Sequence, residues 1–554
     1  MKKNNLSALL LICTLAWCSA CKQNLTNDAA GKAVDSVSIN AINKEGFTKY
    51  IGALASDSFQ GRKPFSKGET LSINYIRDQF KELKLSPGND SSYFQDVPMV
   101  EITSSPGSLQ ITGAKGSLTL NYLNDFVAVS RHEVPAVDIK ASEMVFAGFG
   151  IKAPEYGWDD YQGLDVKGKT VIVMVNDPGF YDTTLFKGKT MTYYGRWTYK
   201  YEEAARQGAA ALIIIHDTPP ASYPWTVVRS SFSGSKLYLK ADDKGSNRAQ
   251  AEAWITTDAA SNIFKLAGQS TDLLAKAKMK GFKPVDLHLH ASLSMTNKIK
   301  YAMSHNVIAK IDGSVHPNEY IIYSAHWDHL GIGEAVKGDS IYNGAVDNAS
   351  GVAAILEVAK AFTLGKQPER TIVFIAVTSE EQGLLGSEYY ALHPVYAVKK
   401  TVADINIDAL SAFGTTKDIS VIGYGQSNLD EYLAIAARKQ GRVIKKEPNP
   451  SAGAFFRSDH FNFAKVGIPS LYTEGGIDSR AHGAVWGKAQ SDDYTANRYH
   501  QASDNFEPAK WDFGGMIEDT RLMFDVGHTL ANERNFPSWK AGSEFKVIRE
   551  NSLK

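Results

Sequence analysis

Apolar runs rich in β-branched residues alternate with helical segments over the second half of the chain, and this pattern most restricts the fold. The runs occupy residues 320–325, 371–377, 401–407, 419–422 and 468–472. Segments with a helical period lie among them, at 351–362, near 384–392 and at 429–438. Because continuous apolar strands joined by helical crossovers are typical of parallel sheets, we predict an α/β fold in which helices sandwich a mostly parallel, mixed sheet.

A change in the pattern of apolar and turn-forming residues divides the chain. Its 554 residues have room for about two to four domains. Short strands, such as 170–175 and 211–215, alternate with Gly- and Pro-rich turns between 135 and 297. We therefore predict an inserted β-rich domain at 135–297. The segments 41–134 and 298–535 would form one main domain, and 536–554 a polar tail.

The N-terminus has the form of an export signal. A basic start precedes an apolar run from Leu6 to Trp17, which is too short to span a membrane. We predict a signal peptide at 1–20 and a flexible tether at 21–40. The segment Cys18-Ser-Ala-Cys21 resembles a bacterial lipobox, so we expect an exported protein, in the periplasm or at the cell surface, anchored to the membrane by a lipid on Cys21.

Charge and hydropathy exclude two classes of protein. Sixty basic and 60 acidic residues give a formal net charge of zero, so there is no overall basic field and we expect no nucleic-acid partner. No apolar stretch of 18 or more residues occurs after the N-terminal segment, which excludes a protein with several membrane spans.

Histidines and carboxylates follow the ends of the predicted strands. These segments are His326-Trp-Asp-His329, Asp347, Glu380-Glu381, Asp408 and, much later, His500. Each by itself has an ordinary explanation as a turn, a solvated pair or a helix N-cap. Together they predict a metal site, because sites in open α/β sheets form where the strands end.

The number of ligands suits two metal ions. A pair of ions needs one bridging carboxylate and further ligands on each side. We assign the bridge to Asp347, one ion to His326 and Asp408, and the other ion to Glu381 and His500. Imidazole nitrogen with carboxylate oxygen favours zinc.

Two carboxylates remain beside these ligands. Asp328 lies two residues from His326 on the same side of an extended segment, so it can orient the imidazole. Glu380 is next to a ligand without being needed as one, which is what a general base acting on a metal-bound water requires.

The motifs resemble the co-catalytic dizinc exopeptidases, a family that includes bacterial leucyl-type aminopeptidases, glutamate carboxypeptidase and the non-catalytic transferrin receptor. The resemblance lies in His326-Trp-Asp-His-Leu-Gly331, Asp347-Asn-Ala-Ser-Gly351, Glu380-Glu-Gln-Gly-Leu-Leu-Gly386, Asn406-Ile-Asp408, Arg457-Ser-Asp-His460 and Tyr499-His500. It implies two Zn²⁺ per chain on the same five ligands, with Glu380 as the base, in a zinc-peptidase (phosphorylase/hydrolase-like) fold. The segment Ser56-Asp57 to Gly61-Arg62 also looks like this family.

The insertion resembles a protease-associated domain, at Gly148-Phe-Gly150 and Ala204-Ala-Arg-Gln-Gly-Ala209. This resemblance implies a cap over the active site. Arg196, in the aromatic-basic cluster 193–197, is expected to line the substrate cleft, although ordinary aromatic packing explains that cluster equally well.

Three further residues are candidates for substrate contacts. The resemblance to the carboxypeptidase branch implies that the hydroxyl of Tyr499 steadies the oxyanion. Arg457 and Ser458 are expected to contact the substrate.

The first functional hypothesis is an aminopeptidase that removes N-terminal residues from peptides through a metal-bridging hydroxide, with Glu380 as general base. The second is a carboxypeptidase acting on acidic dipeptides, which would need a positive clamp such as Arg196 or Arg457. Two further hypotheses are a non-catalytic binding protein like the transferrin receptor and a single-zinc acyltransferase like glutaminyl cyclase. Two, one or no zinc ions per chain would separate peptidase, cyclase and binding protein.

Overall fold

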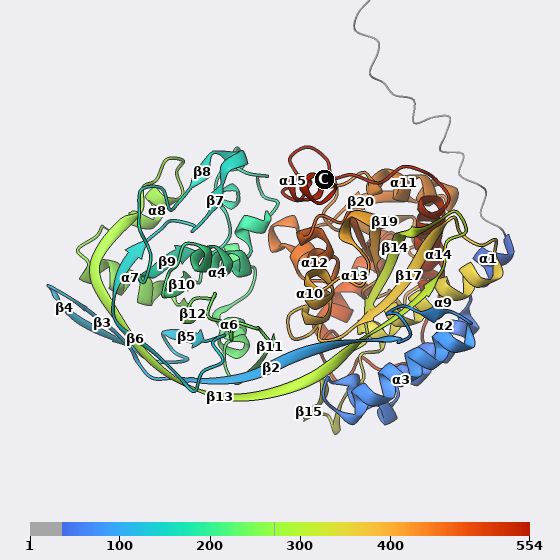
Figure 1. Ribbon diagram of the computed structural model, residues 1–554, viewed down its shortest axis with the longest axis horizontal. Coiled ribbons are helices and arrows are strands. Elements are labelled where there is room, and N and C mark those ends of the chain that lie inside the picture. The colour runs from blue at the N-terminus through green and yellow to red at the C-terminus, as the bar shows by residue number, and fades with distance from the viewer. Residues whose placement is uncertain (1–35, 271) are drawn as a thin grey trace, which may run out of the picture.

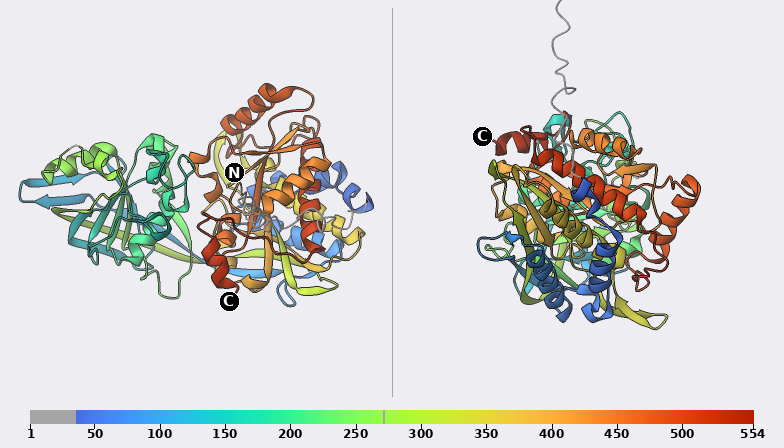
Figure 2. Two further views of the ribbon diagram at one scale, coloured as in Figure 1. Left: turned by 90° about the horizontal axis from the view of Figure 1, so that it is seen from above. Right: turned by 90° about the vertical axis from the view of Figure 1, so that its right-hand side faces the viewer.

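The protein is described by a computed structural model over residues 36–270 and 272–554. The predicted signal peptide and Cys21 lie outside the described residues. Two lobes lie side by side and are joined by long strands (Figures 1 and 2). We call residues 109–295 the inserted lobe, because their apolar side chains share cores of their own, and the remaining described residues the main lobe.

The main lobe is built on a mixed sheet, which confirms the predicted fold class. Its strands, in spatial order, are β13 (Val285–Ile311), β17 (Arg370–Val377), β14 (His316–His326), β18 (Thr401–Asn406), β21 (Ser470–Gly475), β19 (Asp418–Val421) and β20 (Val443–Lys446). The four strands from β17 to β21 are parallel, whereas β13 and β19 run antiparallel to their neighbours β17 and β21.

Both faces of this sheet are buried, as its apolar strands predict. All eight residues of β17 are buried. Ile372, Phe374 and Ala376 belong to one core and Val373 and Ile375 to another, because successive side chains of a strand point to opposite faces.

Helices form the layers on the two faces. The first core receives α2 (Lys44–Leu54), α3 (Lys67–Glu82), α9 (Ser350–Leu364) and α14 (Gly514–Ala531). The second face is covered by α10 (Leu385–Leu392) and α12 (His460–Lys465). No helix in the described ranges is long and apolar enough to cross a bilayer.

The inserted lobe contains a second sheet, with the parallel strands β6 (Ala136–Phe146), β9 (Thr170–Met174), β10 (Ala211–Ile215) and β12 (Ala251–Ile255) next to the antiparallel β5 (Phe126–Val129). Its core takes in Leu109, Ile111 and Leu120 from β3 (Leu109–Gly113) and β4 (Gly116–Leu120). Residues 109–129, which we had predicted in the main domain, therefore pack in this lobe.

Two long strands connect the lobes. The strand β13 is 27 residues long and pairs antiparallel with β2 (Phe94–Pro106), from Val307↔Phe94 to Met295↔Pro106. The pair follows the lower edge of the molecule in Figure 1. The predicted domain boundary at 297 lies inside this continuous strand, so the chain has no linker there.

The C-terminal segment, which we predicted as a polar tail, packs against the main lobe. Trp539 and Phe545 are almost fully buried, and α15 (Lys546–Ser552) ends the chain. Arg549 donates to the carbonyls of Val398 at 2.8 Å and Thr401 at 2.7 Å. Single aromatic residues among polar ones thus anchor this segment. Residues 36–40, predicted in the tether, form the short helix α1 (Ser36–Asn40).

Candidate metal centre

The predicted ligands come from loops at one edge of the main sheet. His326 ends β14, Glu381 follows β17, and Asp408 follows β18. Asp347 lies in the irregular turn Ala345–Ala349 that precedes α9. Because β14, β17 and β18 are parallel, their carboxyl ends bring these side chains together. His500 does not follow a strand but a helix, α13 (Gly483–Asn497).

The structure brings all five predicted ligands into contact. His326 Nε2 lies 3.2 Å from Asp347 Oδ1 and 3.1 Å from Asp408 Oδ1. His500 Nε2 lies 3.2 Å from Asp347 Oδ2 and 3.0 Å from Glu381 Oε2. Asp347 thus turns one oxygen to each group, as a bridging carboxylate must.

The donor set fits zinc. A tetrahedral zinc ion with bonds of about 2.0–2.1 Å holds neighbouring donors about 3.3 Å apart, close to the separations above. Burial lowers the pKa of His500, but its contacts with Asp347 and Glu381 outweigh this effect and raise the pKa to about 10. The carboxylates therefore favour a cation between these side chains.

Asp328 supports His326 through its main chain. The backbone carbonyl of Asp328 accepts from His326 Nδ1 at 3.1 Å, whereas the carboxylate Oδ1 lies 3.8 Å from the same nitrogen. That carboxylate accepts instead from the backbone N–H of Glu380 at 3.1 Å. Asp328 thus connects the loop of the first histidine with the loop of the candidate base.

The carboxylate of Glu380 forms no hydrogen bond with any described residue, although it lies close to the ligands. Burial raises the pKa of this carboxyl well above its usual value; His326 opposes the shift, while Asp408 and Glu381 add to it. A carboxylate that has no hydrogen-bond partner and lies beside the ligands can take part in proton transfer.

Ser458 holds a ligand in place. Its buried hydroxyl donates to Asp408 Oδ2 at 2.6 Å and accepts from Asn406 Nδ2 at 2.8 Å. Both hydrogen-bonding directions are thus used within the protein. The substrate contact that we expected for Ser458 stays a prediction.

A buried arginine ties three segments around the site, and its role was not foreseen. The guanidinium of Arg62 is fully buried and donates to the carbonyls of Trp327 (2.9 Å), Leu54 (2.9 Å), Asn343 (2.5 Å) and Gly344 (2.8 Å). The only signal was the family-like segment that ends at Gly61-Arg62.

Asp504 has a comparable role that the sequence analysis missed. Its carboxylate accepts from the backbone N–H groups of Val346 and Asp347, each at 3.1 Å. It therefore fixes the turn that presents Asp347. Its position four residues after His500 was the only hint.

Two of the remaining predicted residues lie at the surface. Tyr499 is 45% exposed and stacks on His500, with ring centroids 3.9 Å apart. Arg457 is exposed and follows the loop of Ala452, to whose carbonyl it donates at 2.8 Å. Arg196 comes from the inserted lobe and lines the same pocket as Arg457.

Comparison with known proteins finds a family model that matches the segment containing this site. Residues 306–524 match the sequence model of Peptidase family M28. Carboxypeptidase Q from Xenopus laevis is 29% identical over 253 residues, which cover 45% of this chain and 43% of that protein. Aminopeptidase NAALADL1 from Mus musculus is 35% identical over 143 residues, 24% of this chain and 18% of that protein.

A probable zinc metalloprotease from Pyrenophora teres f. teres is 42% identical over 103 residues, 18% of this chain and 22% of that protein. These matches span less than half the length of each relative. The names of these relatives are those of peptidases and metalloproteases. The match to Peptidase family M28 covers residues 306–524, the segment that contains all five predicted ligands.

Proposed function

We propose that this protein is a zinc-dependent exopeptidase with two zinc ions per chain, which removes residues from the N-termini of peptides. The observation that carries the proposal is Asp347, whose two oxygens face two separate groups of ligands. A scaffold protein without catalysis has no need of this arrangement, and a single-zinc cyclase needs only one of the two groups.

The chain's own residues supply the acid–base chemistry. Bound zinc would polarise the scissile carbonyl and make the attacking water more acidic. Glu380 takes a proton from that water and later gives it to the leaving amine. Asp328 fixes the backbone of Glu380, so that the carboxylate stays beside the ligands. The hydroxyl of Tyr499 is proposed to donate to the oxyanion, since it is bound to none of the described residues.

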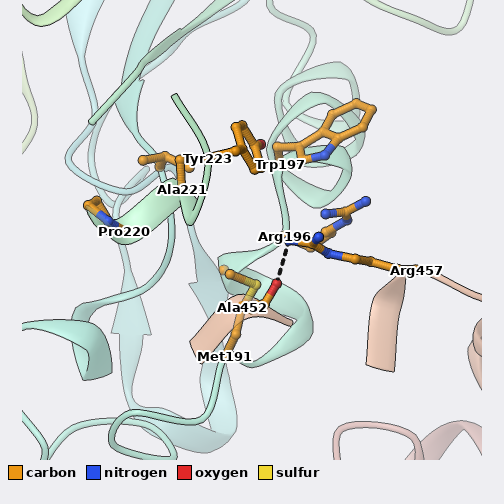
Figure 3. A pocket seen from close by; sticks show the side chains of 10 residues that line it. Met191, Arg196, Trp197, Pro220, Ala221, Tyr223, Ala452 and Arg457 are labelled. Atoms are coloured by element: carbon orange, nitrogen blue, oxygen red, sulfur yellow. Dashed lines mark hydrogen bonds between the residues drawn. The ribbon is translucent and has the colours of Figure 1, made fainter. Parts of the chain in front are cut away.

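A second candidate, a carboxypeptidase, is favoured by one specific observation. The guanidinium groups of Arg196 and Arg457 lie close together in a pocket between the lobes (Figure 3). Burial lowers the pKa of Arg196 to about 10, and the charge of Arg457 adds to this effect. No carboxylate pairs with either group in the described part of the chain. A substrate carboxylate would neutralise both.

A panel of short peptides with free, N-blocked and C-blocked ends tests the two candidates, with products read by mass spectrometry. The first proposal expects cleavage that stops when the N-terminus is blocked and continues when the C-terminus is blocked. The reverse pattern would replace it by the carboxypeptidase, and no cleavage of any peptide by the zinc-loaded protein would contradict both.

The variant Arg457→Gln refines this test. If the arginine pair binds a substrate carboxylate, the variant raises KM for peptides with a free C-terminus about tenfold or more and leaves the KM for C-terminal amides unchanged. An equal change for both substrates would argue against a carboxylate clamp.

We also propose that the protein is exported and anchored through a lipid on Cys21. The N-terminal signal and the lipobox-like segment support this location. Metabolic labelling with a fatty acid should mark the wild type and not Cys21→Ser, and equal labelling of both would contradict the anchor.

A further inference from the structure

His329 lies against the second group of ligands but is not among the five predicted ones. Its ring is fully buried, and Nδ1 lies 2.6 Å from Glu381 Oε1. One donor atom from each of His329, Asp347 and Glu381 can be chosen so that all three atoms lie within 4.8 Å of one another. Because an ionised carboxylate can only accept, Nδ1 of His329 carries the proton and donates it.

The two oxygens of Glu381 consequently have different partners. Oε1 accepts from His329, whereas Oε2 lies 3.0 Å from Nε2 of His500, a predicted ligand of the same ion. Oε2 therefore faces the side of the predicted second metal position, whereas Oε1 faces His329. The contact with His329 thus distinguishes the two oxygens of Glu381.

The position of the His329 ring is fixed from the other side. Gly344, at φ +54°, packs against it so closely that a Cβ atom there would lie 2.6 Å from two ring carbons. Gly344 immediately precedes the turn that carries Asp347. The imidazole is therefore held between the loop of the bridging carboxylate and Glu381, and it cannot turn away without displacing one of them.

We propose that His329 is a positioning residue that holds Glu381 in a one-oxygen binding mode and so sets the affinity of the second metal position. This inference rests on the proposed two-zinc centre. Partners that orient a ligand typically change metal affinity about 10- to 100-fold when they are removed.

The test compares His329→Leu with His329→Asn in metal-free protein titrated with Zn²⁺ against a chromophoric chelator. Leucine removes the donor, whereas the side-chain amide of asparagine can donate from nearly the position of Nδ1. We expect the leucine variant to bind the second zinc about 10- to 100-fold more weakly and the asparagine variant to stay within a few-fold of the wild type. His216→Leu, a buried histidine of the inserted lobe, is the matched control and should bind both ions normally.

Absorption spectra of the Co²⁺-loaded proteins provide a readout that a purely structural role would not change. We expect the asparagine variant to keep the wild-type ligand-field bands, because the ligands are the same. Altered bands in that variant, together with weak binding, would make His329 a direct ligand and overturn the positioning role. Unchanged binding in the leucine variant would overturn it as well.

The wild-type titration separates this inference from the proposed function. If the wild type and both His329 variants bind two ions equally well, only the proposed role of His329 is refuted. A wild type that binds fewer than two ions overturns the two-zinc centre and this inference with it. Thermal melts of the metal-free variants verify that each is folded.

Discussion

At the scale of single residues, Glu380 is the side chain on which turnover should depend. Its carboxylate lies near the ligands but forms no hydrogen bond with them or with any other described residue, so Glu380→Gln removes the base and disturbs little else. We expect kcat to fall about 10²- to 10⁴-fold. Zinc content and melting temperature should match the wild type. A variant with parental turnover of a good substrate would disprove the role of Glu380.

His460 provides a prediction about pH at the same scale. Its ring is fully buried, and neither ring nitrogen has a hydrogen-bond partner among the described residues. Burial lowers the pKa of His460 to about 3, against a value of about 6.5 in the unfolded chain. Between these values the unfolded state binds the extra proton, so the free energy of unfolding falls as the pH drops from about 6.5 to about 3, by at most about 1.4 kcal/mol per pH unit.

Denaturant unfolding at several pH values measures this effect. In His460→Phe the loss of stability between pH 6.5 and pH 4 should be smaller than in the wild type, since phenylalanine cannot take up the proton. His290→Gln, at an exposed position, should follow the wild-type curve. Equal pH dependence in all three proteins would show that His460 does not couple folding to protons.

At the scale of elements, Arg62 ties the segment after α2 to the loop after β14 and to the loop before α9. Arg62→Met would leave four buried carbonyls without this donor, and each such loss costs about 1–3 kcal/mol. We expect the free energy of unfolding to fall by at least about 3 kcal/mol, with Arg62→Lys in between. Chemical denaturation measures the change, and the exposed Arg229→Met is the control. A loss below about 1 kcal/mol would mean that water replaces the guanidinium.

The ligand loops and the supports behind them differ in how well the sequence predicts them. His326, Glu381 and Asp408 could be predicted because each follows a strand that is apolar on both faces, and parallel strands end at one edge. Arg62 and Asp504 could not, because they bind backbone carbonyls and N–H groups, which leave no pattern of residue types. His329 was visible only as a neighbour of the first histidine.

The lobe to which a segment belongs was predicted less well than the fold class. Residues 109–129 form strands that could belong to either lobe, since an alternating pattern does not say which core receives its apolar face. The segment 536–554 has too few apolar residues for a period, yet Trp539 and Phe545 bury their rings. Such single anchors depend on contacts far away in the chain, and local patterns do not reveal them.

At the scale of the whole molecule, two ion pairs join the lobes. Lys187 Nζ lies 2.6 Å from Glu544, and Lys465 Nζ lies 2.9 Å from Glu202. If each ion pair contributes about 1 kcal/mol, removing both would change the equilibrium between lobes in contact and lobes apart by up to about thirtyfold.

We therefore expect the double variant Lys187→Met/Lys465→Met to show a larger radius of gyration in solution scattering and a lower kcat/KM for short peptides. Lys276→Met removes an exposed pair with Asp272 inside the inserted lobe and should change neither quantity. If the double variant scatters as the wild type does, the lobes are held by their other contacts.

The strand β13 has a consequence for how the molecule can be divided. Together with β2 it forms one continuous pair of hydrogen-bonded strands that extends through both lobes. Cutting the chain at either end of the inserted lobe would remove an edge strand from one lobe. It would leave a long strand with unpaired backbone groups on the other. We therefore expect the separated lobes to aggregate, and an exchange of the inserted lobe to succeed only if the paired strands β2 and β13 are kept.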